Sequence, residues 1–426
     1  MLSPMVLPAD ENSVANTYSE HMRSRPLVVF LDSYSWQAFV DLAGALRHRH
    51  VRVARVAGRS TSLRVRLVQR MEAWVFGRLH RRVEGGTLHG TTAVISPADL
   101  SAAIPADAAD VQMQEDLVLS ALELGSGPAH PSRHLAPGVD PRILVDKRLQ
   151  IAQAAAVGVP VPRQWDEPTS ATFPVVVKTP IGFGGGGVRV ARDQAGLEAA
   201  WAELSANDGN PFVQEHLGRG VSTGGVAQDG EPLVCVAYDG RPAPDDPTGP
   251  SQVIVAVDNA EAVANTAAFL RSIGYTGFFC LDWVTGPDGR LRLIDFNARV
   301  FGSWVALQDL GFDLVGAYLH VIGAGPAPEA SVGKYGVAAP MLRYPCPPAE
   351  TREDVMRWRA ETLEVVRARR SWLGSRWAAV IRMRTVLGTA RALGKVHKQS
   401  RSAVGASTAT TAEGESCRHE SSSRAR

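Results

Sequence analysis

The sequence predicts a protein of the α/β and α+β classes, with an N-terminal α/β domain, a larger α+β domain and a basic helical extension. Three observations support this prediction. A strand–helix–strand pattern begins near Pro26, predicted strands and helices alternate from Phe173 and end in a hairpin at 277–300, and ten Lys and Arg but no Asp or Glu lie from Val365 to Ala412. The chain has 426 residues, of which 45% are hydrophobic, so it can form two or three domains with buried cores.

The bulk composition excludes several protein classes. The formal net charge is +2, so the chain as a whole is no polyelectrolyte. Its four cysteines form no CxxC pair and lack zinc-ligand spacing, which favours a reduced, cytoplasmic protein. Residues 1–25 lack the basic start and apolar core of a signal peptide, and we expect a disordered leader there. No uncharged apolar run approaches the roughly 18 residues that a membrane span needs.

Residues 26–138 are predicted to form the N-terminal α/β domain. Its expected elements are a strand at 26–32, a helix at 36–49, strands at 51–56 and 91–96, and a helix at 109–124. The Pro/Gly-rich residues 126–138 are expected to connect it to the next domain. Because open α/β sheets bind ligands where their strands end, residues 32–35 are a candidate part of a substrate site, with a helix cap as the alternative.

Residues 139–330 are predicted to form the second domain. Its expected elements are helices at 141–156, 193–207 and 259–274, and strands before Lys178 and at 188–192, 211–217, 231–240, 277–284 and 290–300. The last two strands are joined by TGPDG, which is a turn sequence, and are expected to form a hairpin.

Four consecutive glycines follow Lys178. Gly182, Gly184 and Gly187 fit the dinucleotide pattern GxGxxG, but that pattern needs a helix after it, and residues 188–192 alternate like a strand. The segment is therefore predicted to be a hairpin with a glycine-rich tip. Such a tip can bring backbone N–H groups close to phosphate, with Lys178 as an added charge, or it can be a flexible loop without a function.

The hairpin LDWVTGPDGRLRLIDFNAR carries the second candidate site. Asp295, Asn297 and Arg299 alternate along its second strand and are expected to share one face, with Asp282 diagonally across from Asp295. Carboxylate and amide oxygens suit Mg²⁺, and an arginine at the edge can hold a phosphate or carboxylate. The alternative is an ordinary polar strand face. A magnesium–nucleotide site would explain this face and the glycine loop together.

In this order the motifs resemble the ATP-grasp superfamily, in the style of carboxylases and carboxylate–amine ligases. They are a Lys147 that follows an aspartate on a helix, VVVKTPIGFGGGGVRV (175–190), VQEHLGRG (213–220) and LDWVTGPDGRLRLIDFNAR (281–299). The resemblance covers about residues 140–325. It implies a Rossmann-like pre-ATP-grasp domain followed by a two-subdomain ATP-grasp fold, whose small lid subdomain occupies about residues 165–220.

The resemblance also implies a role for each matching residue. ATP and Mg²⁺ (or Mn²⁺) would be the cofactors, and Lys178 and Arg299 would be catalytic, with Arg299 facing an acyl phosphate. The implied nucleotide contacts are Lys147, Lys178, Gly184, Gly185, Gly186, Gly187, Gln214, Glu215, His216 and Leu217, and the implied metal ligands are Asp282, Asp295 and Asn297. The family usually has Glu where this chain has Asp282 and Asp295, so the number of metal ions is not fixed by the resemblance.

The function implied by the resemblance is ATP-dependent ligation. A carboxylic acid would be activated as an acyl phosphate and joined to an amine, with ADP and phosphate released. The alternatives are a small-molecule kinase and a nucleotide-binding regulatory or scaffold protein. The expected partners are a small carboxylate and an amine, whose identity the sequence does not show. Arg241 and Ser251 flank a loop and are weak candidates for substrate contacts.

The C-terminal part changes in character. Residues 331–398 are predicted to be an extension with basic helices, and residues 399–426, rich in Ser, Thr and Ala, a disordered tail. The basic helix can pack on the body with a solvated face, or bind an anionic membrane or an acidic partner. Nucleic acid is the least expected partner.

Overall fold

The structure is a computed structural model. It describes residues 25–31, 36–58, 72, 75, 80–83, 85–88, 92–95, 104–124, 126–127, 130–165, 171–182, 187–206, 210–241, 251–329, 333–341, 349 and 351–420. Residues 32–35, Gly184 to Gly186 and the predicted leader up to residue 24 lie outside this set. Two compact units emerge from the internal contacts: residues 1–341 with 372–374, and residues 342–371 with 375–426.

A parallel sheet opens the first unit. Its strand order is β3-β2-β1-β6, with β1 at Leu27–Leu31, β2 at Arg52–Gly58, β3 at His80–Val83 and β6 at Ala108–Met113. Helix α2 (Gln37–His48) connects β1 to β2, as the predicted βαβ start requires. All five residues of β1 are buried, which explains its unbroken apolar sequence. A separate hairpin joins β4 (Gly85–Leu88) to β5 (Thr92–Ile95).

One predicted helix is partly wrong. Residues 108–113 form β6, and only α5 (Glu115–Leu122) in the predicted range 109–124 is helical. The segment pairs with β1 along its length, so tertiary pairing overrides a pattern that also fits a helix. Two polar side chains in β6, Asp110 and Gln112, are buried and bonded to each other, with 2.7 Å from Gln112 Nε2 to Asp110 Oδ2.

Two short 3₁₀ turns precede the helix that carries Lys147. They are η1 (Pro131–His134) and η2 (Pro141–Leu144), and α6 follows at Lys147–Ala156. The predicted helix 141–156 is thus interrupted. The reason is local: the Asp146 side chain accepts hydrogen bonds from the backbone N–H groups of Arg148 and Leu149, so α6 begins with its own cap at Lys147.

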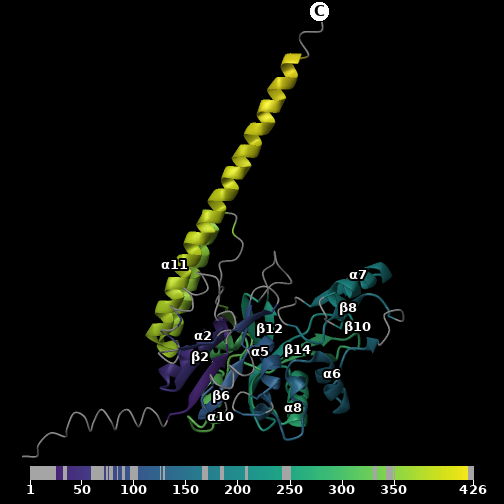
Figure 1. Cartoon of the computed structure of the whole chain (residues 1–426), viewed down its shortest axis with the longest axis vertical. Helices are drawn as coiled ribbons and strands as arrows, with labels where there is room; N and C mark the ends of the chain where they lie inside the picture. The colour runs from purple at the N-terminus through teal and green to yellow at the C-terminus, as the bar shows by residue number, and fades with distance from the viewer. Residues whose placement is uncertain are drawn as a thin grey trace, which may run out of the picture. The chain divides into compact units, whose positions relative to one another are not determined.

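A four-stranded sheet with one helix lies in the range predicted for the lid subdomain. The strand order is β7-β10-β8-β9, formed by β7 (Gln164–Trp165), β8 (Val175–Lys178), β9 (Val188–Ala191) and β10 (Phe212–Glu215). Helix α7 (Gln194–Ser205) covers one face of it (Figure 1). Val175, Val177 and Leu197 are fully buried between helix and sheet. Strands β8 and β9 are antiparallel, so the predicted glycine hairpin is confirmed.

The largest sheet has six strands in the order β15-β14-β11-β12-β13-β16. They are β11 (Ser222–Gln228), β12 (Glu231–Arg241), β13 (Val253–Val257), β14 (Gly277–Thr285), β15 (Leu291–Asn297) and β16 (Ala338–Pro340). Helix α8 (Ala260–Ile273) packs against β11 and β12, and its Phe269 shares a core with Phe279 and Leu281 of β14. The opposite side of β14 faces α9 (Trp304–Asp309) and α10 (Leu314–Val321), because Phe278 contacts the rings of Trp304 and Tyr318.

Strand β11 was not predicted. Its glycine pair, Gly224 and Gly225, lowers the strand propensity of the sequence. The structure shows why glycine is needed, because a Cβ atom at Gly225 would lie 1.8 Å from the Val234 carbonyl oxygen. Strand β11 is central: it pairs with β12 on one side and with β14 on the other.

Most of helix α11 (Arg352–Glu420) belongs to the second unit, and the helix is interrupted at Gly374, where φ is 86°. Two helical segments result, and the predicted helical extension is confirmed. The first begins with a capping arrangement in which Asp354 N–H donates to Thr351 Oγ1 at 3.1 Å. The backbone remains helical to Glu420, whereas the sequence predicts disorder from residue 399; the stretch contains no proline that would break a helix. Among the described residues, no helix is long and apolar enough to cross a membrane.

Candidate active site

Two aspartates face each other across the hairpin β14–β15. Asp282 pairs directly with Asp295, so the predicted diagonal placement is wrong. The register shifts between Asp282 and Trp283, because Trp283 pairs with Leu293 and leaves Ile294 as an extra residue on β15. This bulge could not be predicted from the turn sequence. It brings two carboxylates onto the same face at the shortest cross-strand spacing.

Two lysines reach this pair from other elements. Lys147, at the start of α6, places its Nζ 3.1 Å from Asp295 Oδ1 and 2.9 Å from the Gly182 carbonyl oxygen. Lys178, at the end of β8, donates from Nζ to the carbonyl oxygen of the bulge residue Ile294 at 2.9 Å. Ile294 is the extra residue of the bulge, so its carbonyl oxygen is free of the regular β14–β15 pairing and can accept from Lys178. Three separate segments converge on β15.

The ionisable groups in this cluster are buried and close together, and both conditions shift their pKa values. Lys178 is only 4% exposed, and its burial lowers its pKa to about 8, although the nearby Asp295 opposes the shift. Burial also raises the pKa of Asp282 to about 6, and the negative charge of Asp295 adds to that rise. Ser222 of β11 donates to Asp282 Oδ1 at 2.6 Å, which partly offsets it. Two adjacent carboxylates that accept few hydrogen bonds can stabilise a bound cation.

Asn297 and Arg299 lie beside the carboxylates but bond to each other. Arg299 donates from Nη2 to Asn297 Oδ1 at 3.2 Å and from Nη1 to the Val300 carbonyl oxygen at 3.2 Å. Its guanidinium also lies 4.3 Å from the ring centre of Trp36. The amide oxygen of Asn297 keeps one lone pair for a metal ion. No cluster of three or more His, Cys, Asp or Glu suited to a metal occurs in the described ranges, so the donor set here is two carboxylates and one amide.

Two buried glutamines, which sequence reasoning missed, hold this strand in place. Gln150 of α6 donates from Nε2 to the Phe296 carbonyl oxygen at 2.9 Å and accepts from Phe296 N–H at 3.0 Å. Phe296 lies between Asp295 and Asn297, so this contact fixes the backbone of both. Gln112 of β6 accepts from Val300 N–H at 3.2 Å, next to Arg299. In the sequence, the only indication of a role for Gln150 or Gln112 is that each polar residue has apolar neighbours.

Replacing Gln150 by leucine is expected to lower the free energy of unfolding by about 2–4 kcal/mol. The change leaves Phe296 N–H, its carbonyl oxygen and that of Ile143 without their buried partner. Chemical denaturation of the purified variant measures this loss. The matched control is Gln153→Leu, one turn along α6, because the Gln153 side chain is only partly buried and makes a weak 3.5 Å bond to the Ser272 carbonyl oxygen. Equal losses of unfolding free energy in the two variants would show that the hydrogen bonds of Gln150 to Phe296 do not specifically stabilise β15.

One face of the four-stranded sheet β7-β10-β8-β9 is largely apolar and carries, besides Lys178, a second buried polar side chain. Val190 pairs with Val176, and Val176 with Gln214, so the three side chains share the face of Lys178. Val190 is 50% exposed, whereas Gln214 is 2% exposed and its Nε2 has no hydrogen-bond partner among the residues that the structure describes. A buried, unsatisfied donor beside an exposed apolar surface fits a ligand that is both flat and hydrogen-bonding.

The other predicted nucleotide contacts lie at the last residue of β10, in the two residues after it and at Gly187. Glu215 accepts from Arg292 Nη1 at 2.8 Å, which ties β10 to β15, and His216 is exposed. Leu217 is half-buried. Gly187 supports the loop geometry, because a Cβ atom there would lie 2.3 Å from Thr179 Oγ1.

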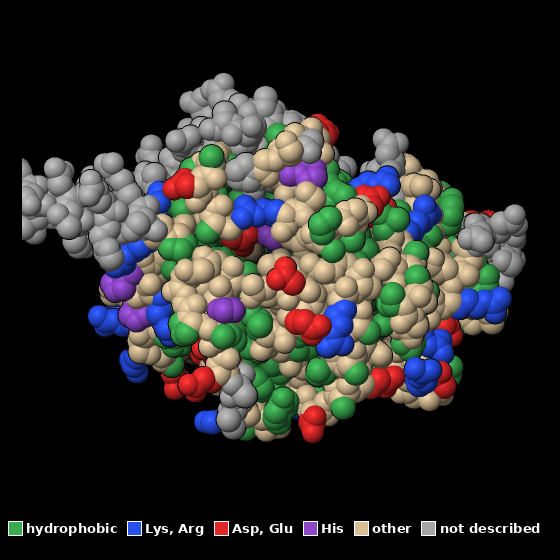
Figure 2. Space-filling view, turned by 90° about the horizontal axis from the view of Figure 1, so that it is seen from below, with side chains coloured by type: hydrophobic (Ala, Val, Ile, Leu, Met, Phe, Trp, Pro, Cys, Tyr) green, Lys and Arg blue, Asp and Glu red, His purple; other side chains and the backbone are tan. Residues whose placement is uncertain are grey.

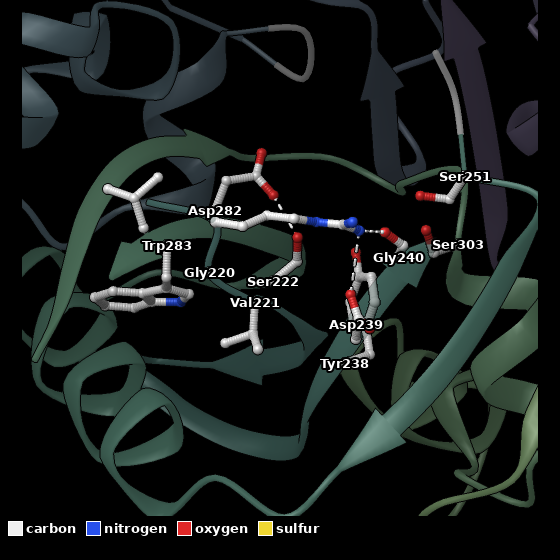
Figure 3. A pocket seen from close by; sticks show the side chains of 12 residues that line it. Gly220, Val221, Ser222, Tyr238, Asp239, Gly240, Ser251, Asp282, Trp283 and Ser303 are labelled. Carbon is white, nitrogen blue, oxygen red and sulfur yellow. Dashed lines mark hydrogen bonds and ion pairs between the residues drawn. The ribbon is translucent and has the colours of Figure 1, made fainter. Parts of the chain in front are cut away.

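A polar cavity of about 390 Å³ opens beside Asp282. In Figure 3, Asp282 and Ser222 lie toward one end, and Asp239, Gly240, Ser251 and Ser303 toward the other. The weak candidates are close to it: Ser251 lines the cavity, and Arg241 Nε lies 3.0 Å from Asp239 Oδ2. Arg219, missed by sequence reasoning, lines it too and donates to the Gly240 carbonyl oxygen at 2.5 Å. These residues come from strands far apart in the sequence, so spacing could not reveal them.

Comparisons with known proteins support the fold alone. No protein-family model and no curated protein sequence matches the chain. Many solved structures resemble it over most of its length, and three of them serve as examples. The biotin carboxylase of Campylobacter jejuni, in a β-γ-ATP complex, has a TM-score of 0.55 and 13% identity, and the match covers 73% of each chain.

The other two also contain nucleotides. The biotin carboxylase domain of the 2-oxoglutarate carboxylase of Hydrogenobacter thermophilus, in complex with MgADP and bicarbonate, has a TM-score of 0.54 and 14% identity, with 73% of each chain covered. The N5-carboxyaminoimidazole synthase of Aspergillus clavatus, with ADP and 5-aminoimidazole ribonucleotide, has a TM-score of 0.54 and 13% identity, covering 71% of this chain and 78% of that one. The parallel N-terminal sheet, the four-stranded sheet and the six-stranded sheet of this chain thus together form the ATP-grasp fold.

Proposed function

We propose that this protein is an ATP-dependent ligase that activates a small carboxylic acid as an acyl phosphate and joins it to an amine. One observation carries the proposal. The carboxylates Asp282 and Asp295 directly oppose each other and are met by Lys147 and Lys178 from two other segments. Anionic and cationic groups placed together in this way suit a metal-bound polyphosphate, which needs both kinds of partner.

The nucleotide would lie between the lid and the six-stranded sheet. The apolar side chains of Val176 and Val190 would contact the base, and Gln214 Nε2 would donate to it. The segment Glu215, His216 and Leu217 would line its edge, partly through backbone atoms. Lys147, Lys178 and the loop Gly184 to Gly187 would contact the phosphates, since glycine lets backbone N–H groups approach an anion closely.

The residues present fit Mg²⁺, and Mn²⁺ would fit the same oxygen donors. Asp282, Asp295 and Asn297 would hold the ion, with phosphate oxygens and water completing its shell. When bound, it would neutralise charge on the transferred phosphoryl group. Aspartate is one methylene shorter than the glutamate usual in the resembling family, and here Asp282 and Asp295 lie directly opposite each other on neighbouring strands.

The acid and the amine would use the polar cavity beside Asp282. Arg299 lies at the end of β15 and would bind the carboxylate or its acyl phosphate, held in orientation by Asn297 and by the ring of Trp36. The cavity of about 390 Å³ has room for a small polar molecule. Closing of the lid would exclude water and so protect the acyl phosphate from hydrolysis before the amine attacks.

The test is ADP release by the full chain with Mg-ATP and pools of small acids, bicarbonate included, and of amines. We expect ADP formation only when an acid and an amine are both present. ADP formed with one substrate alone would indicate a kinase instead. ATP binding without turnover across broad pools would favour a regulatory or scaffold role, and a failure to bind ATP would contradict every reading of this site. Asp258→Asn, at an exposed aspartate after β13, is a control that should leave the rate unchanged.

A further inference from the structure

The second segment of α11 exposes an apolar stripe. Met383, Val386 and Leu387 are 37%, 54% and 43% exposed, and Ala390 beside them is exposed as well. Their spacing of three and four residues places them on one face of the helix. Three large apolar side chains exposed together on one helix are unlike the single exposed residues that any soluble surface carries.

Basic residues border this stripe. Arg382 lies one turn before Val386, while Arg391 and Lys395 lie one and two turns beyond Leu387, and all three are exposed. The sequence from residue 365 to 412 holds ten Lys and Arg and no Asp or Glu, so no acidic side chain on this stretch neutralises them. Figure 2 shows a different distribution on one face of the molecule, where described acidic and basic side chains are interspersed.

We propose that this amphipathic face, formed by Met383, Val386, Leu387, Arg382, Arg391 and Lys395, binds the surface of a lipid bilayer with anionic headgroups. Apolar side chains flanked by long cationic ones match the boundary between acyl chains and headgroups, since Arg and Lys extend to the phosphates while the stripe enters the apolar layer. A nucleic acid would engage the charges and leave the stripe in water. The contact would be peripheral, because no described helix can cross a membrane.

The two kinds of side chain are both required. Three apolar residues bury too little area for stable anchoring, and the cationic residues each add a screened attraction. Binding should therefore be reversible, and it should weaken as salt rises, because the attraction extends only about 10 Å in about 0.1 M salt.

The experiment is co-sedimentation of the full chain with vesicles of phosphatidylcholine, with and without phosphatidylglycerol. We expect binding only to the anionic vesicles, and about tenfold weaker binding for the double variant Val386→Gln with Leu387→Gln and for Arg391→Gln with Lys395→Gln. Matched controls are Met356→Gln, an apolar residue 40% exposed on the first segment of α11, and Arg142→Gln with Arg290→Gln, which remove two exposed charges from the first unit. These controls should bind as the unchanged chain does.

Several outcomes would overturn the proposal. Equal binding to neutral vesicles would remove the role of the basic residues, and unchanged binding by both double variants would place the contact elsewhere. A doubled mass in solution that the Val386/Leu387 variant abolishes would assign the face to a second copy of the chain. Retention on an acidic protein or nucleic acid, with no vesicle binding, would assign it to that partner. None of these readings depends on whether the chain is a ligase.

Discussion

Asp295→Asn is expected to lower the rate of ADP formation by about a thousandfold, because it removes one of two opposing carboxylates without changing the shape of the side chain. The remaining Asp282 would hold a divalent cation weakly, and Lys147 would lose its partner at 3.1 Å. The lost negative charge would also lower the pKa of Asp282, since Asp295 contributes to its rise to about 6. Steady-state ADP release with the identified substrates measures the rate.

A second readout separates metal binding from folding. Mn²⁺ affinity in the presence of nucleotide, followed by electron paramagnetic resonance, should fall by more than about tenfold in Asp295→Asn and change little in the control Asp258→Asn. Asp295→Glu keeps the negative charge, and its Mn²⁺ affinity should lie between those of Asp295→Asn and Asp258→Asn. Unchanged Mn²⁺ affinity in Asp295→Asn would remove this pair from the metal site. Binding in the unchanged chain should also strengthen as pH rises through about 6, because a proton then no longer competes for Asp282.

The sequence predicts much of this site, and the reasons are local. Alternation along a strand is enough to place Asp295 and Asn297 on one face, and four consecutive glycines after a lysine indicate a hairpin rather than a helix. The direct opposition of Asp282 and Asp295 depends on a bulge at Ile294, which no turn rule gives. Arg299 lies two residues past the end of β15, so its position depends on the contacts of Val300 with β6 and not on strand period.

The rest of the site depends on distant contacts. Strand β6 was misjudged because its polar residues Asp110 and Gln112 look out of place in a buried strand. Distant partners explain them: the Tyr318 hydroxyl donates to Asp110, and Val300 N–H donates to Gln112. Gln150 is one residue in an ordinary helix until β15 lies beside it. The cavity gathers Arg219, Ser251 and other residues from three strands, β11, β12 and β14, and from the loops around them, a set that propensity and spacing do not connect.

Lys178→Met is expected to weaken nucleotide binding by about tenfold to a hundredfold while making the fold more stable. The affinity falls because a charge-assisted contact with phosphate is lost. The fold gains because burial lowers the pKa of Lys178 from 10.5 to about 8, which corresponds to a cost of about 3 kcal/mol for keeping it charged near neutral pH. Losing the bond to the Ile294 carbonyl oxygen offsets about 1 kcal/mol of that gain.

The pH dependence gives this prediction a sign that can be checked. Between about pH 8 and pH 10.5 the unfolded chain keeps the lysine proton that the folded chain has released, so the unchanged protein gains stability from this group as pH rises through that window. The gain in stability from Lys178→Met should therefore be largest below pH 8 and shrink towards pH 10.5.

Two measurements test this prediction. Denaturant unfolding at several pH values measures the stability, and calorimetry with ATP measures the affinity. The control Lys334→Met, at an exposed lysine, should change neither. If Lys178→Met is less stable at pH 7 and keeps its affinity for ATP, Lys178 supports the fold and not nucleotide binding. The reason is that a buried ammonium group whose role is to bind phosphate can be removed without loss of fold stability.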